Sequence, residues 1–265
     1  SAILHFAALA YVGESVERPL DYYRANTAAA IGLLEACNVA GVDRLVFSST
    51  CATYGEPATV PIPETCPQSP ISPYGRSKLM VEHMLADFAE SRARAGRPFA
   101  YAALRYFNVA GCDRSGIVGE AHDPETHLIP IVLQAALGLR DRVNIFGTDY
   151  PTPDGTCIRD YIHVEDLIDA HVRTLDSLKP GDRRAYNLGI GRGHSVREII
   201  AAAERVTGRK IPIVEGPRRP GDPPQLFADP ARIRRELGWS ASITNLDDTI
   251  ASAWNWMRSH PKGYT

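Results

Sequence analysis

Tyr74 and Lys78 have the residue types and the spacing of a proton-transfer pair. Ser72-Pro73 precedes them and suits the first turn of a helix, on which residues i and i+4 share one face. A phenol is a poor base at neutral pH because its ordinary pKa is about 10, and a fixed ammonium nearby favours the phenolate. The pair therefore predicts a tyrosine base whose pKa is lowered by the lysine. The alternative is an amphipathic helix that carries these residues by chance, which is the commoner origin of so short a pattern.

A hydroxyl-rich stretch lies upstream of this helix. Residues 44–47 (Arg-Leu-Val-Phe) are expected to form a buried strand, and Ser48-Ser49-Thr50-Cys51 to form the loop that follows it. Open α/β sheets bind ligands at the carboxyl ends of their strands. This loop is therefore the expected place for chemistry.

Composition and charge exclude several classes of protein. The 265 residues include 29 basic and 31 acidic side chains, for a formal net charge of −2, and 44% of the residues are hydrophobic. No strong global field indicates a nucleic-acid or membrane partner, and no apolar stretch approaches the ~20 residues that span a bilayer. The cysteines are too scattered for a metal site or a disulfide framework, so we expect reduced thiols, no metal and a cytoplasmic enzyme: Cys37, Cys51, Cys66, Cys112 and Cys157.

Runs of strand length alternate with amphipathic stretches of helix length along the chain. The expected strands cover residues 2–8, 44–47, 99–105, 143–147 and 186–189, and the expected helices cover about 21–40, 73 onward, 130–139, 165–178 and 196–208. This alternation is typical of α/β proteins with a parallel sheet.

The motifs between these elements resemble one family. A strand, a Ser/Thr loop and then YxxxK is the order of the short-chain dehydrogenase/reductase superfamily. The finer motifs are TCATYGEP, SPYGRSK, LRYFN, GTDYPTPDGTCIRDYIHV, YNLG, RRPGD and HPKGY. In this order they make the whole chain similar to the UDP-glucose 4-epimerase family. The resemblance implies a Rossmann-type doubly wound parallel sheet, a smaller mixed α/β substrate domain at the C-terminal end, and a homodimer.

The same resemblance implies the reaction. It is the interconversion of UDP-glucose and UDP-galactose, by reversible oxidation at C4 through a 4-keto sugar with tightly bound NAD. Other UDP-sugars, such as UDP-xylose, UDP-arabinose or UDP-N-acetylglucosamine, remain open, as does a non-catalytic UDP-sugar or dinucleotide-binding fragment. Dehydration is set aside, because 4,6-dehydratases carry an Asp-Glu pair where this chain has Cys51-Ala52.

The resemblance also assigns site residues. The implied catalytic residues are Tyr74, Lys78 and Thr50. The residues implied to contact NAD are Phe6, Ala7, Ala8, Asn26, Ser48, Ser49, Tyr74, Lys78 and Tyr106. Those implied to contact the UDP-sugar are Thr50, Phe107, Asn108, His127, Leu128, Asn144, Phe146, Arg159, Val196, Arg219, Asp222 and Leu226.

Three positions depart from the family pattern. Ala10 stands where a lysine often contacts the cofactor phosphates, and His127 replaces a more familiar asparagine. Leu226 stands where a tyrosine restricts the site to plain hexoses and a smaller residue admits an N-acetyl group. Leu226 therefore predicts UDP-glucose and UDP-galactose as the preferred pair, with weak turnover of UDP-N-acetylglucosamine.

The glycine-rich turn GxGxxG of dinucleotide-binding folds does not occur in the sequence. We therefore expect an N-terminally truncated protein whose sheet lacks its first strands, and we expect the chain as written to be inactive. Residues 1–108 would form the remaining NAD-binding domain. Residues 109–265 would form the UDP-sugar domain, with about 156–190 returning to the first.

Overall fold

The computed structural model describes residues 1–219 and 222–264. Pro220 and Gly221, which the sequence places in the turn of RRPGD, lie outside the described residues. The chain divides into two compact units. Unit 1 comprises Ser1–Phe107, Asp169–Leu188 and Ala228–Ser240. Unit 2 comprises Asn108–Ile168, Gly189–Phe227 and Ala241–Thr265.

Unit 1 is built on a parallel sheet with the strand order β1-β2-β3-β8. Its strands are β1 (Ala2–His5), β2 (Arg44–Thr50), β3 (Ala100–Tyr106) and β8 (Arg183–Leu188). The order confirms the predicted α/β class with a Rossmann-like parallel sheet. β1 pairs with β2 on one side only among the described residues, so it forms an edge of this sheet.

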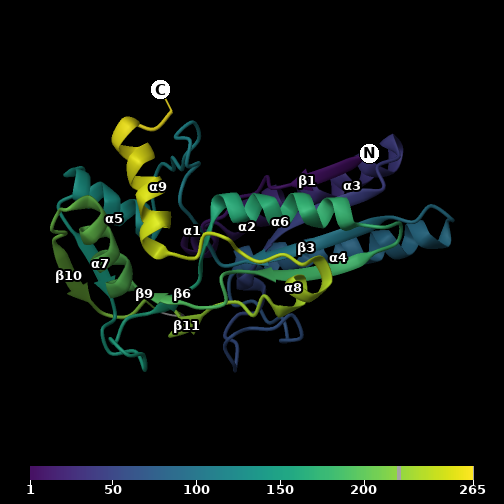
Figure 1. Cartoon of the computed structure of the whole chain (residues 1–265). Coiled ribbons are helices and arrows are strands. Elements are labelled where there is room, and N and C mark those ends of the chain that lie inside the picture. The colour runs from purple at the N-terminus through teal and green to yellow at the C-terminus, as the bar shows by residue number, and fades with distance from the viewer. Residues whose placement is uncertain (220–221, 265) are drawn as a thin grey trace. The chain divides into compact units, whose positions relative to one another are not determined.

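Helices surround the sheet of unit 1 (Figure 1). They are α1 (Val12–Glu17), α2 (Pro19–Tyr22), the π-helix η1 (Tyr23–Ala28), α3 (Ala29–Ala40), the short 3-10 helix η2 (Cys51–Thr53), α4 (Pro73–Arg94), α6 (Val164–Ser177) and α8 (Ala231–Leu237). Two short helices, α1 and α2, lie between β1 and the π-helix η1. The expected single helix of 21–40 contains a π-helical turn.

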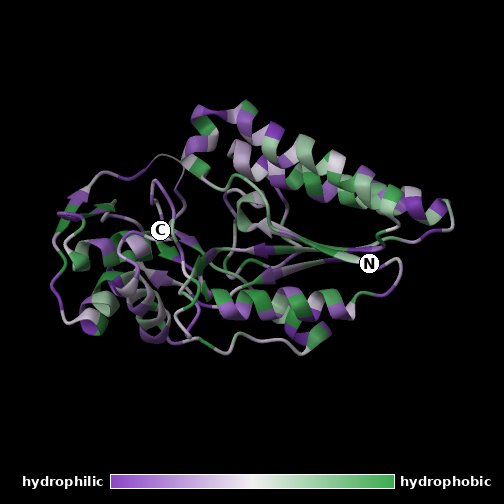
Figure 2. Cartoon of the chain, turned by 90° about the horizontal axis from the view of Figure 1, so that it is seen from above, coloured by the Kyte–Doolittle hydropathy of each residue, from purple (hydrophilic) through white to green (hydrophobic). Residues whose placement is uncertain are grey.

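The core of unit 1 joins one sheet face to α3 and α4. Leu45 and Phe47 of β2 pack there with Val81 and Leu85 of α4, which lie one helical turn apart, and with Leu34 of α3. Side chains alternate between the two faces of a strand, so the odd-numbered residues of β2 point toward α4. Figure 2 shows the strands of this unit as a layer with helices on both sides.

β2 is longer than the sequence predicts. It continues in register with β3 through Ser48, Ser49 and Thr50, which pair with Leu104, Arg105 and Tyr106. The prediction of a loop at these hydroxyls was therefore wrong. The backbone groups of these three residues belong to the sheet, so their side chains follow the strand alternation.

Among its described residues, unit 2 combines helices, including the first residues of α6, with short strands. The other helices are α5 (Leu128–Leu137), α7 (Val196–Thr207) and α9 (Leu246–Ser259). The strands pair as β4 (Asn108–Ala110) with β7 (Tyr161–His163), β5 (Val143–Phe146) with β10 (Ile213–Gly216), and β6 (Ile158–Arg159) between β9 (His194–Ser195) and β11 (Gln225–Leu226). Its core joins the helices through Val132, Leu133, Ile199, Ile250 and Trp254.

The helix starts of unit 2 follow from local sequence signals. Ser195 caps α7 by accepting the N–H of Glu198 at 3.0 Å, and the Glu198 carboxylate accepts the Ser195 N–H at 2.7 Å. This reciprocal pair satisfies backbone donors that have no partner within the helix. In the part of the chain that the structure describes, no helix is both long and apolar enough to cross a bilayer.

Candidate active site

Tyr74 and Lys78 lie on α4 beside the end of β2. The Ser72 hydroxyl caps the helix by accepting the Gly75 N–H at 3.1 Å, and Pro73 occupies its first turn. A Cβ at residue 75 would lie 2.4 Å from the Ala52 carbonyl oxygen, so only glycine allows α4 to approach the segment after β2 this closely. The SPYG motif therefore brings Tyr74 to Thr50.

The three residues predicted to be catalytic, Thr50, Tyr74 and Lys78, lie close together in unit 1. The Thr50 hydroxyl lies close enough to the Tyr74 phenol to lower its pKa. Lys78 Nζ donates to the Ser48 carbonyl at 2.9 Å and lies 5.0 Å from the centre of the Phe47 ring. Tyr74 and Lys78 are 8% and 3% exposed, so a hydroxyl, a phenol and an ammonium share a nearly dry environment.

The pKa of the tyrosine differs from the sequence prediction. Burial raises the pKa of Tyr74 above its usual value, and the hydrogen bond to Thr50 opposes this only in part. Burial also lowers the pKa of Lys78, to about 8. In the protein alone, the lysine therefore does not lower the pKa of the phenol toward neutral pH. Desolvation disfavours the charged form of each group.

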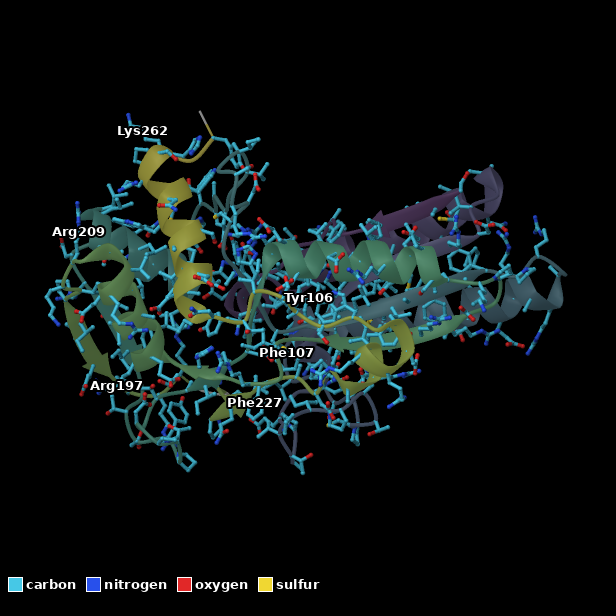
Figure 3. The ribbon with its side chains drawn as sticks, in the orientation of Figure 1. Tyr106, Phe107, Arg197, Arg209, Phe227 and Lys262 are labelled. Carbon is cyan, nitrogen blue, oxygen red and sulfur yellow. The ribbon has the colours of Figure 1, made fainter. Side chains whose placement is uncertain are left out.

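The C-terminal ends of β1 and β3 carry predicted cofactor contacts. Tyr106, labelled in Figure 3 at the end of β3, hydrogen-bonds through its hydroxyl to that of Ser48. Phe107, the next residue, is half-buried. The Phe6 ring lies against that of His171 of α6, with ring centres 4.6 Å apart and the ring planes tilted by 34°. The small residues that follow Phe6 are exposed: Ala7 and Ala8.

Asn26 has a structural role within unit 1. Its Oδ1 accepts the Leu9 N–H at 2.8 Å, and its Nδ2 donates to the Leu9 carbonyl at 2.9 Å and to the Ser77 hydroxyl at 3.0 Å. Asn26 lies in the π-helical turn η1, a feature that is frequent at functional sites. The amide therefore ties the segment after β1 to α4, and its predicted place near the cofactor stays a prediction.

Ser49 points to the opposite face from Ser48 and joins a buried ionic network. Its hydroxyl donates to Glu82 at 2.5 Å, and Glu82 accepts two hydrogen bonds from Arg105, at 3.0 and 2.5 Å. Arg105 also donates to the Tyr54 hydroxyl at 2.9 Å, which donates to Asn187 at 2.7 Å. The hydroxyl of Ser49 therefore supports the sheet from within.

Sequence reasoning missed Glu82, Arg105 and Asn187 as supports of the site. One signal was available, because Glu82 continues the i, i+4 spacing of Tyr74 and Lys78 on α4. A carboxylate on the buried stripe of a helix needs a partner, since an unpaired buried charge is costly. The partner itself lies on β3, and only the fold identifies it.

In unit 2, the predicted phosphate ligand Arg159 lies in the middle strand of a small sheet. It forms an ion pair with Asp222 and is paired in register with Leu226 of β11. The neighbouring strand β9 ends at Ser195, and Val196 begins α7. Residues paired across neighbouring strands point to the same face. Arg159 and Leu226 are therefore neighbours on one face of this sheet.

The predicted uracil contacts lie on one face of β5. Asn144 and Phe146 alternate with the buried Val143 and Ile145, and so point away from the core. The Arg219 guanidinium lies 3.9 Å from the centre of the Phe146 ring, a cation–π contact. Asn108, at the start of β4, donates to the Asp160 carbonyl at 3.3 Å.

His127 precedes α5 and lies among acidic groups. Its Nδ1 is 3.1 Å from a carboxylate oxygen of Glu120 and 3.0 Å from one of Glu125. Hydrogen bonds to these carboxylates raise the pKa of His127 to about 10. Leu128, the first residue of α5, is half-buried. Sequence reasoning named His127 and Leu128 but missed the two glutamates.

Residues 1–189 match the family model described as the NAD dependent epimerase/dehydratase family. The chain belongs to this family.

Relatives and a solved structure align with nearly the whole chain. It is 49% identical over 265 residues to the UDP-glucose 4-epimerase of Lacticaseibacillus casei. This alignment covers 99% of this chain and 78% of that protein. It is 48% identical over 267 residues to the probable UDP-arabinose 4-epimerase 3 of Oryza sativa subsp. japonica, covering 99% of this chain and 65% of that protein. The crystal structure of UDP-glucose 4-epimerase from Brucella ovis in complex with NAD is 50% identical, with a TM-score of 0.90, over 96% of this chain and 77% of that one.

The residues present fit one end of the family's cofactor. The exposed Ala7 and Ala8 leave room at the end of β1, and Ser48, Tyr74 and Lys78 are polar groups of the kind that could hold a nicotinamide riboside. The given sequence contains no GxGxxG turn.

Proposed function

We propose that this chain carries the catalytic residues of a UDP-glucose 4-epimerase that uses NAD. The observation that carries the proposal is the buried ammonium of Lys78, which donates to the Ser48 carbonyl at 2.9 Å one helical turn from the buried Tyr74, with the Thr50 hydroxyl near the phenol. A YxxxK helix without a hydroxyl partner would be an ordinary amphipathic helix. The hydroxyl, the phenol and the ammonium together form an acid–base site.

Tyr74 is the proposed base for the 4-hydroxyl of the sugar. Loss of that proton accompanies oxidation of C4 to a ketone, and return of the proton completes formation of the epimer. When bound, NAD supplies the acceptor for the C4 hydride and then its donor. Thr50 hydrogen-bonds to the phenol and positions it, and the protonated Lys78 stabilises the phenolate that forms.

The UDP part of the substrate is assigned to residues of unit 2. Arg159, Arg219 and Asn108 offer donors for the diphosphate, and a guanidinium fork matches phosphate oxygens in pairs. Asn144 and Phe146 are assigned to the uracil. An epimerase has to hold the nucleotide firmly while the 4-keto sugar turns over, and this assignment leaves the sugar with few polar contacts.

Asp222, Leu226, His127, Leu128 and Val196 complete the proposed substrate site. The ion pair with Arg159 holds Asp222 in place, where its carboxylate is assigned to the ribose hydroxyls. Leu226 is assigned to the sugar, because it shares a face with Arg159. A second candidate substrate is UDP-arabinose, since a relative named as a UDP-arabinose 4-epimerase is 48% identical to this chain.

Conversion of UDP-galactose to UDP-glucose, followed by chromatography with NAD added, tests the proposal. The assay uses the 265-residue chain and, where the gene encodes one, the chain with its preceding segment. Conversion that Tyr74→Phe abolishes supports the proposed function. Failure of the longer, NAD-containing protein to convert UDP-galactose would refute this substrate, and faster conversion of UDP-arabinose would favour the second candidate.

A further inference from the structure

Two Glu-x-His pairs converge in the segment that precedes α5. They are Glu120-Ala-His122 and Glu125-Thr-His127, and they are separated by two residues. One potential ligand atom from each of the four side chains lies within 4.8 Å of all the others. Two imidazoles and two carboxylates therefore meet at one point of unit 2.

The distances within this cluster approach those of a metal coordination shell. His127 Nδ1 lies 3.1 Å from Glu120 Oε1 and 3.0 Å from Glu125 Oε1, and His122 Nδ1 lies 3.1 Å from Glu120 Oε1 and 3.5 Å from Glu125 Oε2. Zinc binds imidazole nitrogen and carboxylate oxygen at about 2.0–2.2 Å, so neighbouring ligands of a tetrahedral zinc are roughly 3.3–3.5 Å apart. All four nitrogen–oxygen separations are therefore within a few tenths of an ångström of that range.

One hydrogen bond from each imidazole does not account for this convergence. An imidazole Nδ1 carries at most one proton and points it at one acceptor. Each of the two Nδ1 atoms nevertheless lies within 3.5 Å of oxygens from both glutamates. A single cation at the centre would contact both Nδ1 atoms and one oxygen of each glutamate at once, and its two positive charges would balance the two carboxylates.

The segment is held in place before any ion binds. The Glu125 side chain is 4% exposed, and its Oε1 accepts the N–H groups of Thr126 at 2.8 Å and His127 at 2.7 Å. Gly119, next to Glu120, donates its N–H to the Tyr264 hydroxyl at 2.8 Å. A Cβ at Gly119 would lie 2.0 Å from the Trp256 ring, so the backbone there lies directly against α9. Ligands that are fixed in this way lose little freedom on binding a metal.

We propose that Glu120, His122, Glu125 and His127 form a binding site for one divalent cation of the zinc class, with tetrahedral geometry. The donor set selects the metal, because imidazole ligands suit zinc and its neighbours, whereas magnesium and calcium prefer six or more oxygen ligands. Coordination through Nδ1 fixes the orientation of the His127 ring. If His127 contacts the UDP-sugar, as the proposed function has it, occupancy of the metal site changes the affinity for UDP.

Cobalt is the first probe of this site, because tetrahedral Co²⁺ shows intense visible absorption bands and octahedral Co²⁺ shows weak ones. The chain is dialysed against a chelator and titrated with Co²⁺, and Zn²⁺ is then measured by equilibrium dialysis. We expect intense bands that saturate at one equivalent and that Zn²⁺ displaces. Weak bands, or no saturable binding, would show that the cluster is only an ion-pair network.

Variants locate the site without reference to activity. His122→Ala and Glu120→Gln should each weaken Zn²⁺ binding by at least about tenfold, whereas the exposed His83→Ala, on α4, should leave it unchanged. Circular dichroism and the Tm of each metal-free variant check that the fold is retained. Zinc affinity that is unchanged in both cluster variants would overturn the proposal.

The link to the substrate is tested separately, by calorimetric titration of UDP with and without Zn²⁺. A changed UDP affinity that His122→Ala abolishes supports the link through His127. An unchanged UDP affinity would refute that link but would not bear on the metal site itself. The cobalt spectra establish or refute the metal site on their own. A longer, NAD-containing protein that binds zinc but does not epimerise would refute the proposed function alone.

Discussion

Lys78 Nζ, on α4, donates a hydrogen bond of 2.9 Å to the backbone carbonyl of Ser48, on β2. The ammonium is 3% exposed and this carbonyl lies two residues before Thr50. One hydrogen bond therefore fixes the helix that carries Tyr74 and Lys78 against β2, the strand that carries the Thr50 hydroxyl. It also keeps a charge in an environment that disfavours charge, which has a measurable consequence for stability.

The free energy of unfolding should depend on pH through Lys78. Burial lowers its pKa to about 8 in the folded chain, whereas an unfolded lysine titrates near 10.4. Between about pH 8 and 10 the unfolded state therefore binds more protons, and this residue makes stability rise by up to ~1.4 kcal/mol per pH unit. Lys78→Met should remove that rise. Urea denaturation of both proteins from pH 7 to pH 10 measures the difference.

The titration of Tyr74 does not interfere with this measurement, because burial raises its pKa and any loss of stability from the phenol begins only above about pH 10. Lys179→Met, at an exposed lysine, is the matched control and should leave the pH dependence unchanged. Parallel stability curves for the wild-type protein and Lys78→Met would contradict the expected titration.

In the chain with its preceding segment, Tyr74→Phe should lower the kcat of epimerisation by about 10²–10⁴-fold, the usual contribution of a general acid–base group. The affinity for UDP should be unchanged, because the proposed UDP contacts lie in unit 2. Tyr101→Phe, a half-buried tyrosine of β3, is the control. A Tyr74→Phe protein that retains more than about a tenth of the wild-type kcat would show that another residue is the base.

The buried pair of Glu82 and Arg105 should contribute strongly to stability. Their side chains are 7% and 8% exposed, so Glu82→Gln leaves a guanidinium buried without its counter-ion. We expect a loss of about 3–5 kcal/mol in the free energy of unfolding. The double variant Glu82→Leu with Arg105→Met should recover most of it. Glu90→Gln, in an exposed ion pair, should have little effect in the same urea titrations.

Leu226→Tyr tests the proposed sugar contact. A tyrosine should narrow the site, so the kcat/KM for UDP-N-acetylglucosamine should fall relative to that for UDP-glucose. A change of this size in a pocket is worth ~1–3 kcal/mol in discrimination, which corresponds to roughly 10-fold or more in the ratio. Gln225→Tyr is the control, because adjacent strand residues point to opposite faces. If the ratio of the two kcat/KM values is the same in Leu226→Tyr and in the wild type, Leu226 does not face the sugar.

Much of the fold could be predicted because its signals are local. The strands β1 and β3 and the helices α4 and α7 have the expected pattern of apolar residues, with Ser72 and Ser195 as caps. The two-residue strands β6, β9 and β11 could not be predicted. They exist because Ile158 and Arg159 find partners far away in the sequence, and so short a run has no periodicity of its own.

The candidate site shows the same division. The spacing of Tyr74 and Lys78 is a property of one helix, and it could be predicted. The pKa of Tyr74 could not, because it depends on the desolvation that the surrounding residues produce. The glutamates beside His127 were missed because no reading of separate residues shows where a loop folds back on itself.

The alternation along β2 limits how this gene can change in length. Ser48 and Ser49 are neighbours in sequence, yet one hydroxyl meets Tyr106 and the other meets Glu82. Deleting one codon between Leu45 and Ser48 would turn each later side chain of β2 to the opposite face of the sheet. It would therefore place the wrong hydroxyl beside each partner. Natural variation within this strand should therefore consist of substitutions, while insertions and deletions should accumulate in the segments that connect the strands.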